Sequence, residues 1–262
     1  MAHPGFKDMA RNPRPKIGTV VLEFDTPGIG QILKAAGLDF IFVDMEHSAF
    51  SFSDLKRTLR YTQAAEIPVL VRVPSDRYDH IARALDVGAD ALMVPMVGTA
   101  EQARHIVSCA KYSPQGERGF APQVAHDRYL PGPVLAKMRA ANRRTSVWAQ
   151  IETAEGAENA DEIAAVRGID CLWVGHMDLS CSLGIPGQYD RPEVKQAFGN
   201  VVNAAKQNKK LLGRMVQDVK TGAAAYAEGF EFIAYHVDAW ALHEFMQANV
   251  AALRKRCRKR AA

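Results

Sequence analysis

Acidic, basic and imidazole side chains stand where several apolar segments of this 262-residue chain end. Glu46 and His47 follow one apolar segment, and Arg72 ends the next one. Glu152 ends a third apolar segment, and Asp178 closely follows a fourth. In a (β/α)8 barrel the C-terminal ends of the strands form the active-site face, so these side chains would converge on one pocket. A base, a cation and two carboxylates in one pocket indicate an enzyme that binds a metal ion.

Eight apolar segments alternate with helical patterns, which predicts eight β-then-α units. The expected strands are residues 17–23, 39–44, 68–73, 90–95, 146–152, 170–175, 210–215 and 231–236. Gly-X-acid triplets that end at Asp39, Asp90, Asp170 and Glu231 precede every second strand, and these acids are expected at the stabilising end of the barrel. Eight units without a glycine-rich phosphate loop favour a closed (β/α)8 TIM barrel over a doubly wound sheet. We expect one barrel domain over residues 1–262.

The composition is that of an ordinary globular protein, with 48% hydrophobic and 24% charged residues. No apolar run approaches the roughly 18–20 residues that span a bilayer, and the N-terminus has no apolar signal core. Four scattered cysteines show no metal-binding spacing: Cys109, Cys171, Cys181 and Cys257. The expectation is a cytoplasmic protein without a membrane partner.

Residues 254–262 form a basic tail, with six cations between Arg254 and Arg260, whereas the net charge of the whole chain is only +4. Such a cluster can bind nucleic acid or anionic lipid. A solvated terminus after the last helix is the preferred interpretation, because no aromatic interleaving or nucleic-acid motif accompanies the charge. No nucleic-acid partner is therefore expected.

Two further segments carry open alternatives. Residues 113–130 form a long loop that is expected to be a lid, a subunit contact or a plain connection. The final helix, from Asp238 to about Leu253, has an apolar stripe that requires a partner, either the barrel or a neighbouring subunit. Ser51 or Ser53 is expected to cap the helix after the second strand, and Ser75 or Asp76 the helix after the third.

Each candidate site residue also has a structural explanation. Glu152 and Asp178 can chelate one divalent cation, or each can cap the helix that follows it. His47 can act as a general base or be a satisfied structural histidine. Arg72 can hold a carboxylate or an oxyanion, or form a salt bridge with Asp44 or Glu46. No lysine ends a predicted strand, which disfavours Schiff-base chemistry.

Six motifs in order resemble the HpcH/HpaI aldolase family, the metal-dependent class II pyruvate aldolases. They are Asp44-Met45-Glu46-His47, Arg72-Val73-Pro74, Leu85-Asp86-Val87-Gly88-Ala89, Pro95-Met96-Val97, Gln150-Ile151-Glu152-Thr153 and Gly175-His176-Met177-Asp178-Leu179-Ser180. The resemblance extends from about Ile17 to the last helix. It implies a phosphoenolpyruvate/pyruvate-type barrel whose C-terminal helix is swapped between subunits of a hexamer, a trimer of dimers.

The same resemblance implies roles for the site residues. Glu152 and Asp178 would hold Mg²⁺, Mn²⁺ or Co²⁺, which would stabilise a pyruvate enolate. Gln150 and the backbone N–H groups of Met177 and Asp178 would bind the 2-oxo acid. Arg72 would stabilise the enolate oxygen.

His47 would be the base, acting through a metal-bound water, with Asp86 raising its basicity. The helical pattern, however, predicts Asp86 near a helix end on the opposite face, so a neighbouring subunit or a bend would have to bring it to His47. Two departures from the family pattern affect the aldehyde partner: His176 replaces the usual proline, and the first strand, residues 18–23, lacks the tryptophan of some members. The seventh strand end also differs, and its Arg214 is a candidate ligand for an acidic aldehyde.

The activity implied is reversible aldol cleavage of a 4-hydroxy-2-oxo acid to pyruvate and an aldehyde. One alternative is a CoA-ester lyase of the citrate lyase β or malyl-CoA lyase type, which the lack of an adenosine-binding extension disfavours. Another is a non-catalytic barrel, which the complete set of polar groups disfavours.

Overall fold

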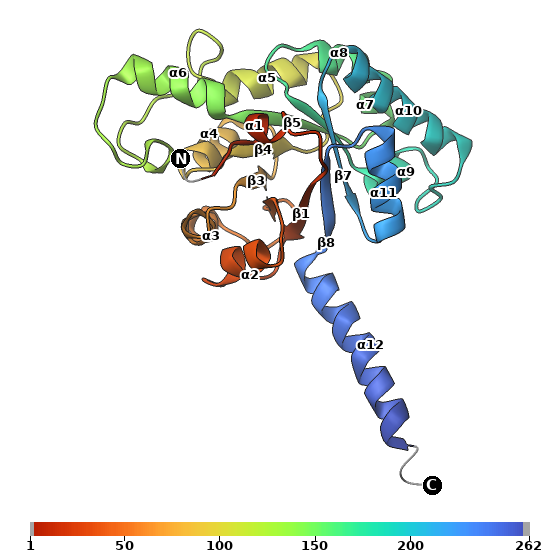
Figure 1. Ribbon diagram of the computed structural model, residues 1–262. Coiled ribbons are helices and arrows are strands. Elements are labelled where there is room, and N and C mark those ends of the chain that lie inside the picture. Colours follow the sequence, from red (N-terminus) through yellow and green to blue (C-terminus); the bar gives the residue numbers. More distant parts are fainter. Residues whose placement is uncertain (1–2, 259–262) are drawn as a thin grey trace.

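Eight parallel strands close into a barrel in the computed structural model, which describes residues 3–258 (Figure 1). The strands are β1 (Lys16–Val21), β2 (Phe40–Asp44), β3 (Val69–Arg72), β4 (Ala91–Val94), β5 (Ser146–Ile151), β6 (Cys171–Val174), β7 (Leu211–Val216) and β8 (Phe232–Val237). Each pairs with the next in the chain, and β8 pairs with β1. All eight predicted strands and the closed barrel are therefore confirmed.

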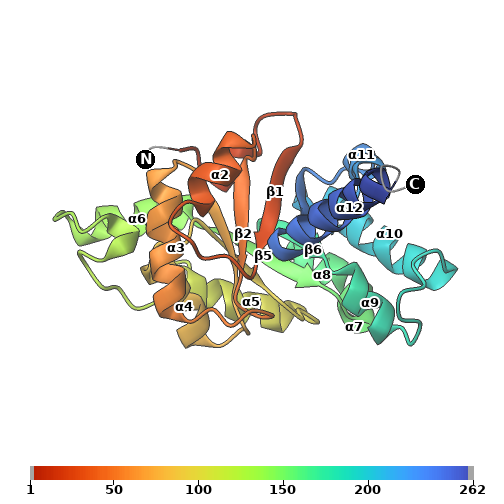
Figure 2. The same ribbon diagram turned by 90° about the horizontal axis from the view of Figure 1, so that it is seen from below.

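Helices follow the strands and cover the outside of the barrel, with α2 to α5 on one side of the strands and α7 to α11 on the other (Figure 2). The helices are α1 (Phe6–Met9), α2 (Ile29–Ala35), α3 (Phe52–Ala64), α4 (Tyr78–Asp86), α5 (Ala100–Ala110), η1 (Ala125–Asp127), α6 (Val134–Arg144), α7 (Ala154–Glu158), α8 (Ala160–Ala165), α9 (His176–Ser182), α10 (Pro192–Gln207), α11 (Val219–Glu228) and α12 (Asp238–Arg258). A large apolar core separates this helical layer from the strands.

The interior of the barrel changes character along its axis. Toward the N-terminal end of the strands a second apolar cluster contains many aromatic rings, and it includes Phe6 of α1. The Phe6 ring lies 5.4 Å from Trp148 and 5.8 Å from Phe232, centroid to centroid. Because side chains alternate between the two faces of a strand, Trp148 is followed on the inner face by Gln150. The strands thus carry apolar groups inside at their starts and polar groups inside at their C-terminal ends.

The four acids of the Gly-X-acid triplets brace the N-terminal end of the barrel. Each accepts a hydrogen bond from the backbone N–H of a residue in the neighbouring odd-numbered strand: Ile17 to Asp39 (2.9 Å), Val69 to Asp90 (3.1 Å), Val147 to Asp170 (2.9 Å) and Leu212 to Glu231 (2.9 Å). The predicted stabilising position of these acids is confirmed.

One of the two predicted helix caps is confirmed. Ser51 accepts a hydrogen bond from the backbone of Asp54 and forms a capping box at the start of α3. The cap predicted for α4 is wrong: Arg77 takes that position without a side-chain hydrogen bond. Ser75 is diverted because its hydroxyl lies 2.9 Å from a ring nitrogen of His80.

Helix α12 leaves the barrel instead of packing on it (Figure 1). Asp238 fixes its start by accepting hydrogen bonds from the backbone N–H groups of Glu23 (3.1 Å) and Phe24 (2.9 Å). Beyond this point Phe245 is 66% and Leu253 63% exposed, so the alternative in which the barrel covers the stripe is wrong. The basic tail begins within α12, and its last residues, 259–262, lie outside the described residues. Among residues 3–258 no helix is long and apolar enough to cross a membrane.

Candidate active site

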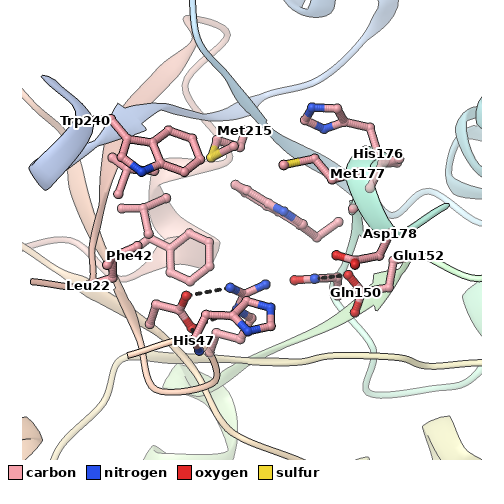
Figure 3. Close-up of a pocket in the computed structure, with 17 residues that line it drawn as sticks. Leu22, Phe42, His47, Gln150, Glu152, His176, Met177, Asp178, Met215 and Trp240 are labelled. Atoms are coloured by element: carbon pink, nitrogen blue, oxygen red, sulfur yellow. Dashed lines mark hydrogen bonds and ion pairs between the residues drawn. The ribbon is translucent and has the colours of Figure 1, made fainter. Parts of the chain in front are cut away.

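A cavity of about 280 Å³ opens at the C-terminal ends of the strands (Figure 3). Most of the predicted site residues line it: His47, Arg72, Gln150, Glu152, Met177 and Asp178. In Figure 3 the carboxylates of Glu152 and Asp178 lie on one wall with Gln150 beside them, and the imidazole of His47 lies lower in the view. The structure therefore brings together side chains from β2, β3, β5 and the start of α9.

Asp44, the last residue of β2, organises the part of the site that contains His47. Its carboxylate is 1% exposed and accepts hydrogen bonds from the backbone N–H groups of Glu46 (2.9 Å) and His47 (3.4 Å). This is the local turn that aspartate favours after a strand. It directs the chain sharply away from β2, so that the His47 side chain is 61% exposed at the mouth of the cavity.

Arg72 is held in a fixed orientation by the same carboxylate. Its Nε donates to Asp44 at 2.9 Å and its Nη2 at 2.5 Å, and Nε lies 3.2 Å from Glu46. Burial disfavours the guanidinium charge, but Asp44 and Glu46 outweigh it and raise the pKa of Arg72. The predicted salt bridge is thus present, and Arg72 nevertheless lines the cavity. A paired, permanently charged guanidinium is preorganised to meet a developing negative charge.

Glu152 lies at the end of β5 and is 2% exposed. One carboxylate oxygen accepts a hydrogen bond from the backbone N–H of Met96 (2.8 Å), and the other accepts one from the amide of Gln150. A Cβ at Gly175 would lie 2.5 Å from Glu152 Oε2, so only glycine lets the chain after β6 pass this carboxylate. The helix-cap explanation is wrong for Glu152, because Thr153 caps α7.

Asp178 lies in the first turn of α9, after the Gly175 N-cap, and makes no capping hydrogen bond. The structure thus leaves its carboxylate to the cavity that it lines. The first N–H groups of a helix have no helical acceptor, so those of Met177 and Asp178 are available to an anion. Their positions agree with the predicted binding of the carboxylate of a 2-oxo acid.

Three carboxylates influence one another across the cavity. Burial raises the pKa of Glu152, and the charge of Glu46 raises it further. Burial also raises the pKa of Glu46, against the opposing charge of Arg72, with a contribution in the same direction from Asp178. In addition, Glu46 Oε2 and Gln150 Oε1 are buried without a hydrogen-bond partner in the described residues. Crowded carboxylates are the environment that a divalent cation stabilises, even though Glu46 Oε2 also lies 3.2 Å from Arg72 Nε.

The carboxylates that line the cavity suit a cation that is held by few protein ligands. Residues 3–258 contain no cluster of three or more His, Cys, Asp or Glu side chains arranged to hold a metal ion. Glu152 and Asp178 would therefore be two carboxylate ligands, leaving the other positions to water and substrate. Such open coordination by oxygen is typical of Mg²⁺ and Mn²⁺.

Asp86 is not brought to this cavity. It ends α4, which returns antiparallel to the strands, and its carboxylate accepts a hydrogen bond from Arg118 (2.5 Å) and lies 3.9 Å from His126. Within one chain Asp86 and His47 are therefore at opposite ends of the barrel. Its role as a partner of His47 stays a prediction that requires a second subunit. The loop of residues 113–130, which supplies Arg118, does not line the cavity, so it is not a lid over its own site.

The structure also places Arg214 and His176, two residues at which this chain departs from the family pattern. Arg214 does not line the cavity but points outward from β7, so the hypothesis that it binds an acidic aldehyde there is wrong. His176 does line the cavity. Burial lowers its pKa to about 4, and the charge of Arg214 acts in the same direction. The imidazole of His176 is therefore neutral near pH 7 and contributes no charge to the site.

Several residues of the site were missed as functional candidates. Asp44 and Glu46 were assigned no role beyond that of salt-bridge partners of Arg72, although Glu46 was expected at the pocket. Trp240 of α12 and Met215 of β7 form an apolar wall (Figure 3). The wall had no sequence signal, because it depends on how β7, β8 and α12 lie in space. The Asp-X-Glu-His spacing itself contained a signal for the Asp44 turn.

Comparisons with known proteins agree with this geometry. The profile of the HpcH/HpaI aldolase/citrate lyase family matches residues 22–244. A 2-keto-3-deoxy-L-rhamnonate aldolase of Salmonella gallinarum (strain 287/91 / NCTC 13346) is 31% identical over 246 residues, covering 94% of this chain and 91% of the relative. A hydroxypyruvate/pyruvate aldolase of Paraburkholderia phytofirmans is 35% identical over 234 residues, covering 87% and 89%.

A solved structure is similar over nearly the whole chain. The HpcH/HpaI aldolase from Desulfitobacterium hafniense DCB-2 superposes with a TM-score of 0.90 at 31% sequence identity. The match covers 96% of this chain and 97% of that one.

Proposed function

The chain belongs to the HpcH/HpaI aldolase/citrate lyase family, and from that premise we propose that it cleaves a 4-hydroxy-2-oxo acid reversibly to pyruvate and an aldehyde. It is a carbon–carbon lyase by family. The observation that carries the proposal is the convergence of Glu152, Asp178, Arg72 and His47 on one cavity. This set contains what a retro-aldol reaction needs: a base, a permanent cation and a place for a metal ion.

We assign the divalent cation, Mg²⁺, Mn²⁺ or Co²⁺, to Glu152 and Asp178. When bound, such an ion supplies a Lewis acid that draws electron density from the 2-oxo group. The protein contributes the two carboxylates, and Met96 and Gln150 hold Glu152 in place through the hydrogen bonds described above.

The remaining residues bind the substrate and move one proton. Gln150 and the N–H groups of Met177 and Asp178 orient the 2-oxo acid. His47 removes the proton of the 4-hydroxyl group, the C3–C4 bond breaks, and the aldehyde leaves. The electron pair of that bond remains on the three-carbon fragment as an enolate, whose oxygen Arg72 stabilises. Protonation at C3 then yields pyruvate, and the reverse sequence condenses pyruvate with an aldehyde.

Pyruvate release from a 4-hydroxy-2-oxo acid is the direct test of this proposal. We expect activity that disappears after exhaustive chelation and returns with Mn²⁺ or Mg²⁺. Full activity in the chelated protein would reject the metal-dependent reaction. Binding of Mn²⁺ without substrate tests the ligands separately: Glu152→Ala and Asp178→Ala should lose it, and a stoichiometric site in either variant contradicts the assignment.

The names of the relatives suggest which 2-oxo acids to compare. One relative is named for pyruvate and hydroxypyruvate, and another for a 2-keto-3-deoxy sugar acid. We propose that the cavity of this chain accepts a three-carbon 2-oxo acid as its nucleophile. A screen of pyruvate and hydroxypyruvate against neutral, polyhydroxylated and acidic aldehydes, with each of the three metals, identifies the preferred pair.

We propose further that α12 packs against a second copy of the chain in a hexamer built as a trimer of dimers. Its exposed stripe supports this: Leu242 is 52%, Phe245 66% and Met246 50% exposed. Stripes of this kind on a helix indicate burial against another element. Sedimentation of Phe245→Glu should show smaller particles than wild type. Removal of residues 254–262 should leave turnover intact unless the basic tail secures the oligomer.

A further inference from the structure

A second cavity, of about 750 Å³, lies outside the barrel between β7, α10 and α11. One face of α10 lines it, with Val194, Phe198 and Val202 spaced four residues apart. His176 and Met215 line both this cavity and the reaction cavity, so these two side chains form the wall between them. Neither the proposed reaction nor its metal ion uses this space.

Arg214 is the main cation of this second cavity. Its side chain is on the outer face of β7, and its guanidinium carbon lies 5.0 Å from the ring centre of Phe198 and 5.5 Å from that of Phe230. Within residues 3–258 Arg214 forms no ion pair, and its Nε is buried without a hydrogen-bond partner. Burial accordingly lowers the pKa of Arg214.

Arg118 and Arg144 also have a buried Nε without a partner, but each donates another hydrogen bond from its guanidinium, which Arg214 does not do within residues 3–258. Arg72 donates two hydrogen bonds to Asp44, and Arg118 donates one to Asp86. An arginine N–H that is buried without an acceptor, as the Nε–H of Arg214 is, is destabilising unless a ligand supplies the acceptor. Stacking on two aromatic rings orients its planar fork but does not satisfy its N–H groups.

The carboxylates of the cavity wall do not fill this role. Asp190 pairs with Lys195 at 3.3 Å, and Asp218 caps α11 through Thr221. Glu228 lines the cavity and its charge favours the charged form of Arg214, but it is not within ion-pair distance of it. The three acids oppose a ligand of high negative charge, and Lys206 is a further cation of the same wall.

We propose that the cavity binds a small organic carboxylate with a single negative charge, whose carboxylate is held by the Arg214 fork and whose apolar part packs on Phe198 and Val202. A guanidinium matches a carboxylate in two parallel hydrogen bonds. The apolar face of α10 favours an organic anion, whereas the acids of the wall disfavour the double charge of inorganic phosphate.

Calorimetric titration with benzoate tests the site while pyruvate and Mg²⁺ saturate the reaction cavity. We expect wild type to bind one benzoate per chain, and its neutral isostere benzamide about tenfold more weakly or less well still. Arg214→Met should weaken benzoate by about tenfold or more. Lys195→Met is the matched control, since Lys195 already pairs with Asp190, and should bind benzoate within about twofold of wild type.

A second variant keeps the test decisive if Arg214→Met does not fold. Glu228→Gln removes the nearest competing negative charge and should tighten benzoate binding, because Arg214 then has no other counter-charge. Equal benzoate affinity in wild type and Arg214→Met overturns the proposal. The proposal is also overturned if benzoate binding is lost when pyruvate is added, or if inorganic phosphate binds more tightly than benzoate. It is overturned as well if wild type shows no saturable binding of benzoate. None of these readouts requires turnover, so the result is independent of the proposed function.

Discussion

Acidic residues at the two ends of the barrel have opposite surroundings. At the N-terminal end Asp39, Asp90, Asp170 and Glu231 each accept a backbone hydrogen bond from a neighbouring strand. Some also meet a cation: Asp39 accepts two hydrogen bonds from Arg14, and Asp170 lies 3.1 Å from Lys7. These carboxylates hold the strands in register.

At the C-terminal end the carboxylates are crowded rather than dispersed. Glu152 is buried and Glu46 half-buried; the charge of Glu46 raises the pKa of Glu152, and burial together with the charges of Asp44 and Asp178 raises the pKa of Glu46. Here a protein without a cation bears the cost of burying like charges. The difference teaches that residue type alone does not separate a stabilising acid from a functional one. The hydrogen-bond partners and the charged neighbours of an acidic residue distinguish the two kinds.

The largest expected effect on activity comes from removing one of the crowded carboxylates at the C-terminal end, that of Glu152. Glu152→Gln keeps the shape of the side chain but removes a charge and a metal ligand. We expect kcat/KM for pyruvate release to fall on the order of 10³-fold. The metal-free variant should melt no lower than wild type, because a buried charge is gone. Wild-type turnover in Glu152→Gln would contradict the contrast between the two ends; assays of activity and of melting in chelator give both values.

His47→Ala tests the base without disturbing the carboxylates. Exchange of the C3 protons of pyruvate should fall roughly 10²–10³-fold, while the affinity for Mn²⁺ stays near that of wild type. Proton exchange followed by NMR, together with Mn²⁺ titration, separates the two effects. His105→Ala, on the exposed face of α5, is the control and should match wild type. Simultaneous loss of the metal in His47→Ala would indicate structural damage instead.

Lys111, a buried lysine at the N-terminal end of the barrel, should make the unfolding free energy of the protein depend on pH. It is 2% exposed and donates to the backbone carbonyls of Asn142 (3.0 Å) and Thr145 (2.6 Å), and burial lowers its pKa to about 7 from 10.5. Between these two values the unfolded chain binds the proton that the folded protein has released. Unfolding free energy should therefore rise with pH, by about 1 kcal/mol per pH unit.

Lys111→Met removes this titration and is the comparison that isolates it. The stability of wild type relative to Lys111→Met should increase as the pH rises from neutral toward 10. Urea unfolding at several pH values measures the difference, and a constant difference would show that Lys111 does not titrate in this range.

The smallest effect is expected at Asp170, one of the bracing acids. Asp170→Ala leaves the buried N–H of Val147 without its acceptor and should cost about 1–3 kcal/mol of unfolding free energy. Asp170→Asn keeps an acceptor oxygen and should cost less. Turnover per folded molecule should be unchanged in both, as measured after denaturant titration. A loss of turnover without a loss of stability would place this acid in the functional group.

Much of the fold was predictable because its signals are local. Alternating apolar segments and the Gly-X-acid triplets placed eight strands and the acids that brace them. The cap at Ser51 followed from a short motif, but the cap expected at Ser75 or Asp76 was wrong, because Ser75 instead contacts His80. Where a side chain could form a hydrogen bond with either of two nearby groups, the sequence did not indicate which of the two it would contact.

The candidate site was predictable in membership and less so in arrangement. His47, Arg72, Gln150, Glu152 and Asp178 were expected together and lie together. Asp86 was expected beside His47 from the resemblance, whereas α4 carries it to the other end of the chain's own barrel. The predicted contact with His47 would require a second subunit, and no pattern within one chain encodes where a second subunit lies.

The amino-acid sequence by itself determined the order of strands and helices and which polar residues gather at one rim, because both follow from periodicity over a few residues and from the parallel direction of the strands. Only the tertiary structure decided the rest. It placed the charge of Glu46 close enough to buried Glu152 to repel it, paired Arg72 with Asp44, turned Arg214 outward and left α12 off the barrel. These outcomes depend on contacts between distant residues and on a strand register in which a shift of one residue reverses the face of every side chain.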